Sequence, residues 1–257
     1  MTRQAPGEGP RATPEPIEFD PERILFHGDG LLVVDKPPGI PVHQGTGHDR
    51  GVAESLDIWV SLNPGVLDLR SRGKIHPIHL LERETSGVLL LGLTRAMART
   101  AKDAFSREKV EKRYLAVVAG PLEDEGHIRG DVRSRVGRRH RYLPGELSYR
   151  RLRGDERLSL VEVRLLGTRP HQVRALFAGA DRPLAGDARY GKPRPARTFL
   201  DRFEMPGFLL HLRELLLPAG VLGPPRSFVA PTPGRFEELC RKKGWSDGLE
   251  EELCQGQ

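Results

Sequence analysis

The sequence predicts an α+β domain with a largely antiparallel sheet, and three observations support this fold class. Short apolar runs that suit buried strands recur along the chain, at 87–93, 113–120, 158–166 and 207–218. Helical patterns lie between some of these runs but not between all of them, so the regular strand–helix alternation of a doubly wound fold is missing. The chain has 257 residues, enough to bury a core in one large domain or two small ones.

Order is expected to begin near Ile24, with a strand that opens the segment 31–45 and breaks at a Pro-Pro-Gly turn. Residues 1–22 precede it. They are rich in proline, glycine and charge and lack the apolar segment of a secretory signal, so they predict a disordered tail. Residues 49–62 carry apolar side chains along one helical face, and Asp49 is a candidate N-cap for that helix.

The middle of the chain predicts two strands around one helix. The run 87–93 is continuous and apolar, which is typical of a buried strand. The helix spans 94–112, because its apolar residues share one face and Thr94 can cap its first turn. A strand at 113–120 follows, and the charged stretch 121–150 is expected to consist mostly of loops.

The last part of the chain predicts two further strands, each followed by a helical segment. The strand at 158–166 precedes a helix at 171–181. The strand at 207–218 precedes a C-terminal helix at 233–245.

The charge of the chain points to a polyanionic partner. The net charge is +6 and the isoelectric point of the sequence is about 9.6, which suits nucleic acid. The arginine-rich stretch 133–141 is either a contact for a phosphate backbone or a flexible, solvated loop. No apolar run is long enough to span a membrane. Cys240 and Cys254 have no metal-type spacing, so a reducing cytoplasm is the expected location.

Several common catalytic signatures are missing from the sequence. It contains no phosphate-binding P-loop, no dinucleotide-binding GxGxxG and no GxSxG elbow. His76 and His79 form an HxxH pair, but no further cluster completes a zinc site, so no metal is expected. Polar residues instead collect where the predicted strands begin or end, and such groups can converge on a cleft. These residues are Lys36, Glu82, Tyr114, Arg169, His171, Gln172 and Arg174.

Five segments match, in order and spacing, the motifs of a known enzyme family. The chain resembles a pseudouridine synthase of the RluA type over residues 31–218. The second segment is similar to the family pattern H-R-L-D-x-x-T-S-G, and the fourth to G-R-x-H-Q-I-R followed by G-D-x-x-Y-G. The matching segments are LLVVDKPPGIPVHQG (31–45), HLLERETSGVLLLGLT (79–94), KRYLAVVAG (112–120), TRPHQVRALFAGADRPLAGDARYG (168–191) and LLHLRELLLP (209–218).

The resemblance implies a fold, a reaction and a partner. The fold is a bent, mixed and largely antiparallel sheet with flanking helices and a central cleft between two subdomains. The reaction converts a specific uridine in structured ribosomal or transfer RNA to pseudouridine, without cofactor or metal. The implied organisation is a tail at 1–22, a catalytic domain at 23–232 and a helical extension at 233–257. A monomer is expected.

The resemblance also assigns roles to individual residues. Glu82 takes the place of the catalytic carboxylate, and Arg174 resembles the arginine that pairs with it and fixes its direction. Tyr114 resembles the tyrosine that stacks on the base close to its C5 proton. The residues that the motifs place against the substrate are Lys36, His79, Leu80, Arg169, His171 and Gln172.

Three positions depart from the family pattern. Glu82 stands where the family has aspartate, and Leu80 where it has the arginine that fills the gap left by the flipped base. Leu176 replaces a histidine further along. The retained residues favour a synthase with a variant carboxylate. The departures favour a catalytically impaired relative that binds structured RNA as a chaperone or assembly factor, and a third possibility is the same fold without an RNA partner.

Overall fold

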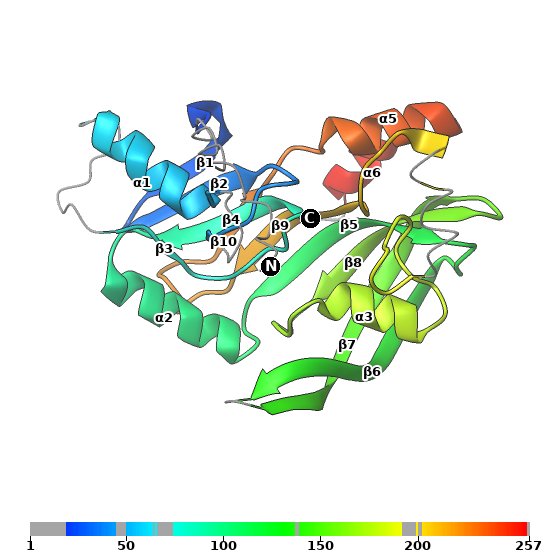
Figure 1. Cartoon of the computed structure of the whole chain (residues 1–257), viewed down its shortest axis with the longest axis horizontal. Coiled ribbons are helices and arrows are strands. Elements are labelled where there is room, and N and C mark those ends of the chain that lie inside the picture. The colour runs from blue at the N-terminus through cyan, green and yellow to red at the C-terminus, as the bar shows by residue number, and fades with distance from the viewer. Residues whose placement is uncertain are drawn as a thin grey trace, which may run out of the picture.

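The computed structural model describes residues 19–44, 50–63, 65, 74–136, 139–191, 199 and 202–255 (Figure 1). A short 3-10 turn at Pro21–Arg23 leads into the first strand. The strands are β1 (Ile24–Gly28), β2 (Leu31–Lys36), β3 (His76–Pro77), β4 (Ser86–Gly92), β5 (Glu111–Ala119), β6 (Glu125–Val136), β7 (Arg139–Gly154), β8 (Leu158–Leu165), β9 (Leu210–Leu217) and β10 (Arg226–Val229). The helices are α1 (Val52–Leu62), α2 (Arg95–Ser106), α3 (Gln172–Gly179), α5 (Gly234–Lys243) and α6 (Leu249–Gln255).

All of these strands join one ten-stranded sheet, in the order β1-β2-β4-β9-β5-β8-β7-β6, with β3 beside β4 and β10 beside β9. Only the short pairing of β4 with β9 is parallel among the described strands. That pair joins the two halves of the sheet. Helices α1 and α2 accompany the half that holds β1 to β4, and α3, α5 and α6 accompany the half that holds β5 to β8 (Figure 1). The predicted class, a largely antiparallel sheet with flanking helices, is confirmed.

Strand β8 shows how the sheet separates two cores. Successive side chains of a strand point to opposite faces. Val161 and Val163 pack into the core that also contains Phe177 of α3. Leu158 and Leu160 point the other way, into a second core that α5 and α6 cover with residues such as Leu239. The C-terminal helices therefore cover the face of the sheet opposite α3.

The helix ends follow local capping chemistry where the structure describes them. Thr94 caps α2, and its hydroxyl accepts a hydrogen bond from the Met97 amide at 3.1 Å, as predicted. Gly51 occupies the N-cap of α1 without a side-chain bond, and Asp49 lies outside the described residues. Helix α2 ends at Ser106 rather than at 112. It stops there because Glu108 adopts a left-handed backbone (φ 56°) and the chain turns into β5.

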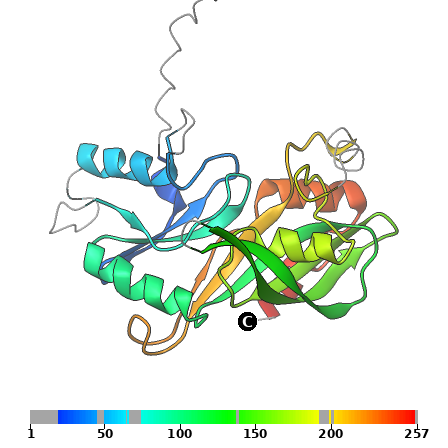
Figure 2. The same ribbon diagram turned by 60° about the horizontal axis from the view of Figure 1, so that its bottom comes forward.

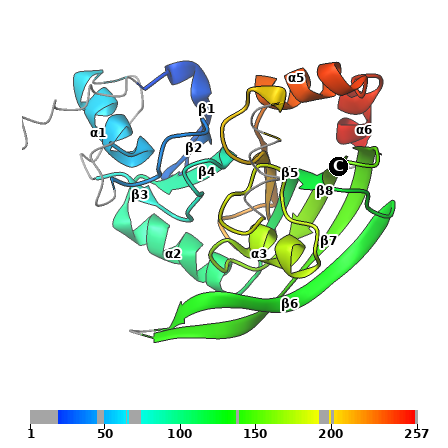
Figure 3. The same cartoon turned by 45° about the vertical axis from the view of Figure 1, so that its right-hand side comes forward.

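The prediction of loops at 121–150 is wrong. This stretch forms most of β6 and β7, which pair continuously from Glu125–Arg150 to Val136–Arg139 and project as a curved ribbon (Figures 2 and 3). Val132, Ser134 and Leu147 are buried on the ribbon's α3 side, whereas side chains that alternate with them, such as Arg133 and Glu146, are exposed. Because only one face of this edge ribbon is covered, its sequence is rich in charge and lacks the apolar content on which strands were predicted.

The C-terminal segment contains the predicted helix and one more. Helix α5 agrees with the prediction of a helix at 233–245, while α6 was not predicted. Glu252 of α6 bonds both Arg150 and Arg153 of β7, at 2.7 and 2.6 Å. No helix among the described residues is long and apolar enough to cross a membrane. The proposed boundaries at residues 22 and 232 stay predictions, and residues 1–18 lie outside the described chain.

Candidate active site

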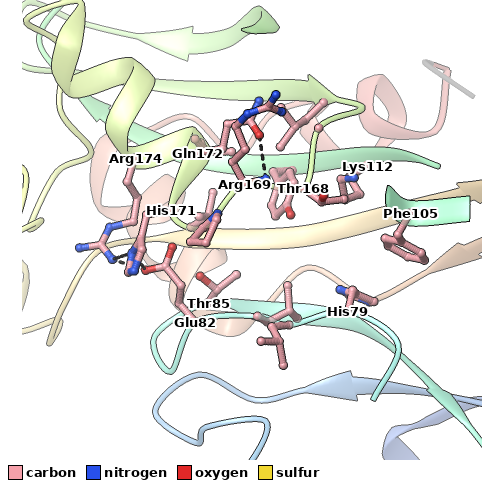
Figure 4. A pocket seen from close by; sticks show the side chains of 18 of the residues that line it. His79, Glu82, Thr85, Phe105, Lys112, Thr168, Arg169, His171, Gln172 and Arg174 are labelled. Atoms are coloured by element: carbon pink, nitrogen blue, oxygen red, sulfur yellow. Dashed lines mark hydrogen bonds and ion pairs between the residues drawn. The ribbon is translucent and has the colours of Figure 1, made fainter. Parts of the chain in front are cut away.

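A cavity of about 730 Å³ lies between the two halves of the sheet (Figure 4). One wall comes from the 78–85 turn and the C-terminal end of α2. The opposite wall comes from Tyr114, the 165–174 segment and Phe208. Its volume lies in the range of small-ligand sites.

The turn that carries Glu82 is fixed by a close approach of two strands. Gly87 opens β4 with a φ of +109°, and a Cβ atom there would lie 2.1 Å from the carbonyl oxygen of Leu212. Only glycine allows β4 to pair with β9 at that distance. The Thr85 amide also bonds the Glu82 carbonyl at 3.1 Å, which closes the turn just before the strand. The Thr-Ser-Gly sequence thus sets where Glu82 enters the cavity.

The Glu82 carboxylate is held from the opposite wall. Its Oε2 atom lies 2.9 Å from Nδ1 of His171 and forms an ion pair with Nη1 of Arg174. Within the described part of the chain, Oε1 has no hydrogen bond or ion pair. The carboxylate therefore has one oxygen that is anchored and one that is available to a ligand in the cavity.

Arg174 is itself fixed by Asp187, which is fully buried. Two parallel hydrogen bonds of 2.7 Å join the guanidinium to the two oxygens of this carboxylate. The guanidinium also lies over the rings of Phe208 and Tyr190, 4.1 and 5.0 Å from their centroids. Burial opposes the charge of Asp187, but the bonds from Arg174 and from the Tyr190 and Arg189 amides outweigh burial and lower the pKa of the carboxyl group. Such bidentate pairing gives Arg174 a single orientation.

Tyr114 lies in the same cavity, on β5 opposite Leu212 of β9. Its side chain is almost completely buried. Burial and the negative charge of Glu82 both raise the pKa of its phenol well above its ordinary value. The phenol is therefore neutral at physiological pH and offers a ring and an O–H group.

His79 and Leu80 are neighbours in the sequence but differ in exposure. The Nε2 atom of His79 accepts a hydrogen bond from the Leu90 amide at 3.1 Å, and its ring stacks on Phe105 with centroids 5.0 Å apart. Burial, together with the charge of Lys112, lowers the pKa of His79 to about 3, so the ring is neutral. Leu80 is 71% exposed at the cavity, with an apolar side chain facing solvent.

Arg169 and Gln172 brace the loop before α3. The Arg169 guanidinium bonds Glu108 at 2.8 Å, and its backbone amide bonds the side chain of Gln172 at 3.1 Å. Gln172 in turn donates to the carbonyl of Glu146 on β7 at 3.2 Å. His171 sits between them with a left-handed backbone (φ 57°), which directs its ring to Glu82.

Two residues named from the sequence lie outside the cavity lining. Lys36 is completely buried, and its Nζ atom bonds the carbonyls of Pro37, Ile40 and Arg83 at 2.8, 2.6 and 3.1 Å. Burial lowers the pKa of its amine to about 7. Leu176 is buried on the side of α3 that meets β6, where its methyl group would touch a Cβ at Gly130. Of the site residues predicted from the sequence, all except Lys36 line the cavity.

The sequence reasoning missed part of the site. Asp187, Tyr190, Phe208 and Lys112 all contact the network or line the cavity. Asp187 and Tyr190 belong to a segment that was matched to the family, so the motif was the available signal. Nothing in the sequence pairs Asp187 with Arg174. Among the described residues, no cluster of three or more His, Cys, Asp or Glu side chains could hold a metal ion.

The fold matches that of solved pseudouridylate synthase domains. The human RNA pseudouridylate synthase domain-containing protein 4 has a TM-score of 0.69 at 21% identity, over 86% of this chain and 92% of that one. The human domain-containing protein 1 has a TM-score of 0.61 at 22% identity, over 82% of this chain and 83% of the other. At this identity the likeness defines the fold class.

The sequence gives the family. A family model described as RNA pseudouridylate synthase matches residues 30–179, more than half of the chain. The chain belongs to the RNA pseudouridylate synthase family.

Two bacterial relatives illustrate the range of the family. The tRNA pseudouridine synthase C of Haemophilus ducreyi is 30% identical over 210 residues, which cover 75% of this chain and 83% of that protein. The ribosomal large subunit pseudouridine synthase D of Nitrosomonas europaea is 29% identical over 207 residues, 78% of this chain. The chain spans 59% of the length of the latter relative.

Proposed function

We propose that this chain is an RNA pseudouridine synthase that isomerises a specific uridine in structured RNA. The observation that carries the proposal is the ion pair of Glu82 with Arg174 inside a cavity that also contains the Tyr114 ring. It offers an oriented carboxylate beside a surface on which a base can stack. Family membership supports RNA as the partner. The names of the two bacterial relatives support ribosomal or transfer RNA.

The proposed reaction is an isomerisation, so no atom is gained or lost overall. A uridine in a helix leaves its stack at a cost of a few kcal/mol and enters the cavity. Its N1–C1′ bond breaks, the uracil turns while it stays bound, and C5 bonds to C1′. C5 loses a proton and N1 gains one, so the product is an isomer of the substrate.

Each residue of the network has a role in this proposal. Glu82 uses its available Oε1 atom to attack C1′ or to remove a proton from the sugar, as carboxylates do in other glycosidic reactions. Arg174 neutralises and orients the anchored Oε2 atom. Tyr114 stacks on the base as a neutral phenol and sits near the C5 proton.

The remaining residues act at different distances from the substrate. His79 and Leu80 are proposed to contact the RNA from the wall of the cavity, and Arg169 from the opposite wall. We infer that Lys36 acts indirectly, because it bonds the carbonyl of Arg83, the residue after Glu82. The monomeric state and the cytoplasmic location stay predictions.

We also propose that Glu82 replaces the aspartate of the family motif. Its side chain is longer by one C–C bond, about 1.5 Å. A misplacement of about 1 Å can cost on the order of 10²-fold in rate. The contacts to His171 and Arg174 support a cavity that accommodates the longer acid, because both side chains reach the same oxygen.

One observation favours an alternative function. Leu80 is 71% exposed where the family motif carries arginine, so this position supplies no cation to RNA. Together with the longer acid, this supports a catalytically impaired protein that binds structured RNA as a chaperone or assembly factor.

The experiment is a mass-based pseudouridine assay on total RNA from a strain that lacks the gene. Purified wild type, Glu82→Gln and Glu82→Asp are run in parallel. A specific pseudouridine from wild type but not from Glu82→Gln is the expected result. If only Glu82→Asp is active, the cavity is intact but the longer acid disables it. No product from any of them, with RNA binding retained, would establish the alternative.

A further inference from the structure

The β6–β7 ribbon is anchored beside the candidate site and extends away from it. Its base is tied to α3 by the hydrogen bond from Gln172 to the carbonyl of Glu146. From there the ribbon continues past the N-terminal end of α3. Figures 1 and 2 place its far end between α2 and α3, and Figure 3 shows it below α2; the ends of both helices line the cavity. The far end of the ribbon therefore lies on the side of the molecule where the ends of these two helices line the cavity.

The far end differs from the base in charge. We call residues 132–136 and 139–143 the arm. The sequence from 132 to 143 contains no acidic residue, and Arg133, Arg139 and Arg141 are exposed. Near the base, by contrast, Arg129 pairs with Glu146 at 3.0 Å. Because the nearest acidic residue along the chain, Asp131, lies just outside the arm, the arginines within the arm repel one another, and an anion would offset this repulsion.

The two faces of the arm carry different groups. Paired residues of an antiparallel ribbon point to the same side. Arg141 pairs with Ser134, which is buried, so Arg141 lies on the side that faces α3. Arg133 pairs with Tyr142 on the opposite side, where the tyrosine is 70% exposed. Exposed aromatic rings beside arginines are typical of surfaces that bind unpaired nucleotides.

We propose that the arm binds the backbone of the RNA that flanks the target uridine while the uridine occupies the cavity. This proposal rests on the function proposed above. From Glu146, which is anchored to α3, to Arg139 is seven residues, or about 23 Å at 3.3 Å per residue. The arm therefore contacts nucleotides several positions from the target. The substrate must be an RNA that extends well beyond the modified base.

The test compares two triple variants that lose the same charge. Arg133, Arg139 and Arg141 are changed to alanine in one protein. The control changes three exposed cations on other elements, Arg157, Arg241 and Lys242. Binding is measured with in vitro transcribed stem-loops of increasing flanking length, at several salt concentrations. Thermal unfolding checks that both variants are folded.

For long stem-loops, the arm variant is expected to bind about 10- to 100-fold more weakly than the control, with a log–log salt slope shallower by about two. For the shortest stem-loops the two variants are expected to bind alike. Tyr142→Ala should lower the affinity for long stem-loops several-fold without changing the salt slope. Equal binding of both triple variants to long RNA would overturn the proposal, as would an equal loss on RNA of every length.

The same measurements separate this proposal from the proposed function. Binding is read without reference to pseudouridine formation. If affinity depends on the arm and on RNA length but no pseudouridine forms, RNA binding by the arm is supported and the proposed enzyme activity is refuted. If pseudouridine forms but affinity does not depend on the arm, the enzyme activity is supported and the proposal for the arm is overturned.

Discussion

Arginines serve two opposite purposes in this molecule, and the cavity and the arm show the contrast. Arg174 is buried and bonded to two carboxylates, and it lies between aromatic rings. Arg139 and Arg141 are exposed at the end of a ribbon. The first guanidinium has one orientation, which its partners dictate. The others are free to follow a ligand.

The difference shows what the surroundings of a charge allow it to do. A buried, bidentate guanidinium determines geometry, because its planar fork matches a carboxylate. Exposed cations interact through water, so their effect depends on charge number and salt rather than on shape. Chemistry in the cavity should therefore be sensitive to the identity of one arginine, while the contribution of the arm's arginines to binding should depend on their total charge.

The largest effect is expected from Arg174→Lys. Lysine keeps the charge but cannot bond Asp187 with two parallel N–H groups while it also reaches Glu82. We expect the rate of pseudouridine formation to fall on the order of 10²-fold or more, and stability to fall by about 1–3 kcal/mol. Single-turnover kinetics and denaturant unfolding measure the two effects. A wild-type rate would mean that the bidentate geometry is unnecessary.

The buried ring of His79 should make stability depend on pH. Burial and Lys112 lower its pKa from 6.5 to about 3, so the unfolded chain binds a proton below pH 6.5 and the folded chain does not. Stability therefore decreases as the pH falls from 6.5 towards 3, by up to about 1.4 kcal/mol per unit from this group. His79→Gln keeps an acceptor for the Leu90 amide and removes the titration.

The measurement is the free energy of unfolding of both proteins between pH 7 and pH 4. The variant should show the shallower slope. His211, whose pKa burial also lowers to about 3, is unchanged in both proteins and contributes a slope of the same sign to each. Parallel slopes would show that His79 is not buried in its neutral form. Mutations of the exposed arm residues Arg139 and Arg141 should leave the slope unchanged.

A smaller effect is expected from His171→Asn. Asparagine tolerates the left-handed backbone at this position, so the start of α3 is retained. The variant loses the 2.9 Å contact to Glu82 but keeps the ion pair with Arg174. We expect the single-turnover rate to fall about tenfold, because the Glu82 carboxylate keeps only one of its two contacts, while RNA affinity stays within about twofold. A loss of affinity with an unchanged rate would instead assign His171 to RNA binding.

The smallest effect is expected from Arg139→Lys combined with Arg141→Lys. These changes preserve the charge of the arm and remove only the planar fork. RNA affinity and its salt slope should stay within about twofold of wild type. Arginine-to-lysine substitution would then greatly reduce the rate at Arg174 and leave RNA affinity nearly unchanged in the arm. A large loss here would mean that the arm recognises a specific phosphate geometry.

Much of the fold was predictable because apolar runs and caps act locally. The buried strands β4, β5, β8 and β9 overlap the segments predicted as strands from their apolar content, and Thr94 caps α2 as its sequence context indicates. The β6–β7 ribbon was not predictable in the same way. Its strands are held by pairing and by one covered face, and neither contribution produces an apolar run.

The residues of the candidate site were likewise predictable where a short stretch of sequence identifies them. The chain by itself identified four residues of the cavity, since Glu82, Tyr114, His171 and Arg174 stand in recognisable motifs. It also determined Gly87, without which β4 could not approach β9. These features depend on short stretches of sequence, whose conformation is set by neighbouring residues.

Only the tertiary structure decided which of these residues act together. It paired Arg174 with Asp187 and brought both to Glu82, which lies on the other half of the sheet. It also buried Lys36 outside the lining of the cavity and extended the β6–β7 ribbon past α3 towards α2. The physical reason is that charge pairing and burial depend on distances across the folded sheet, and sequence separation does not encode those distances.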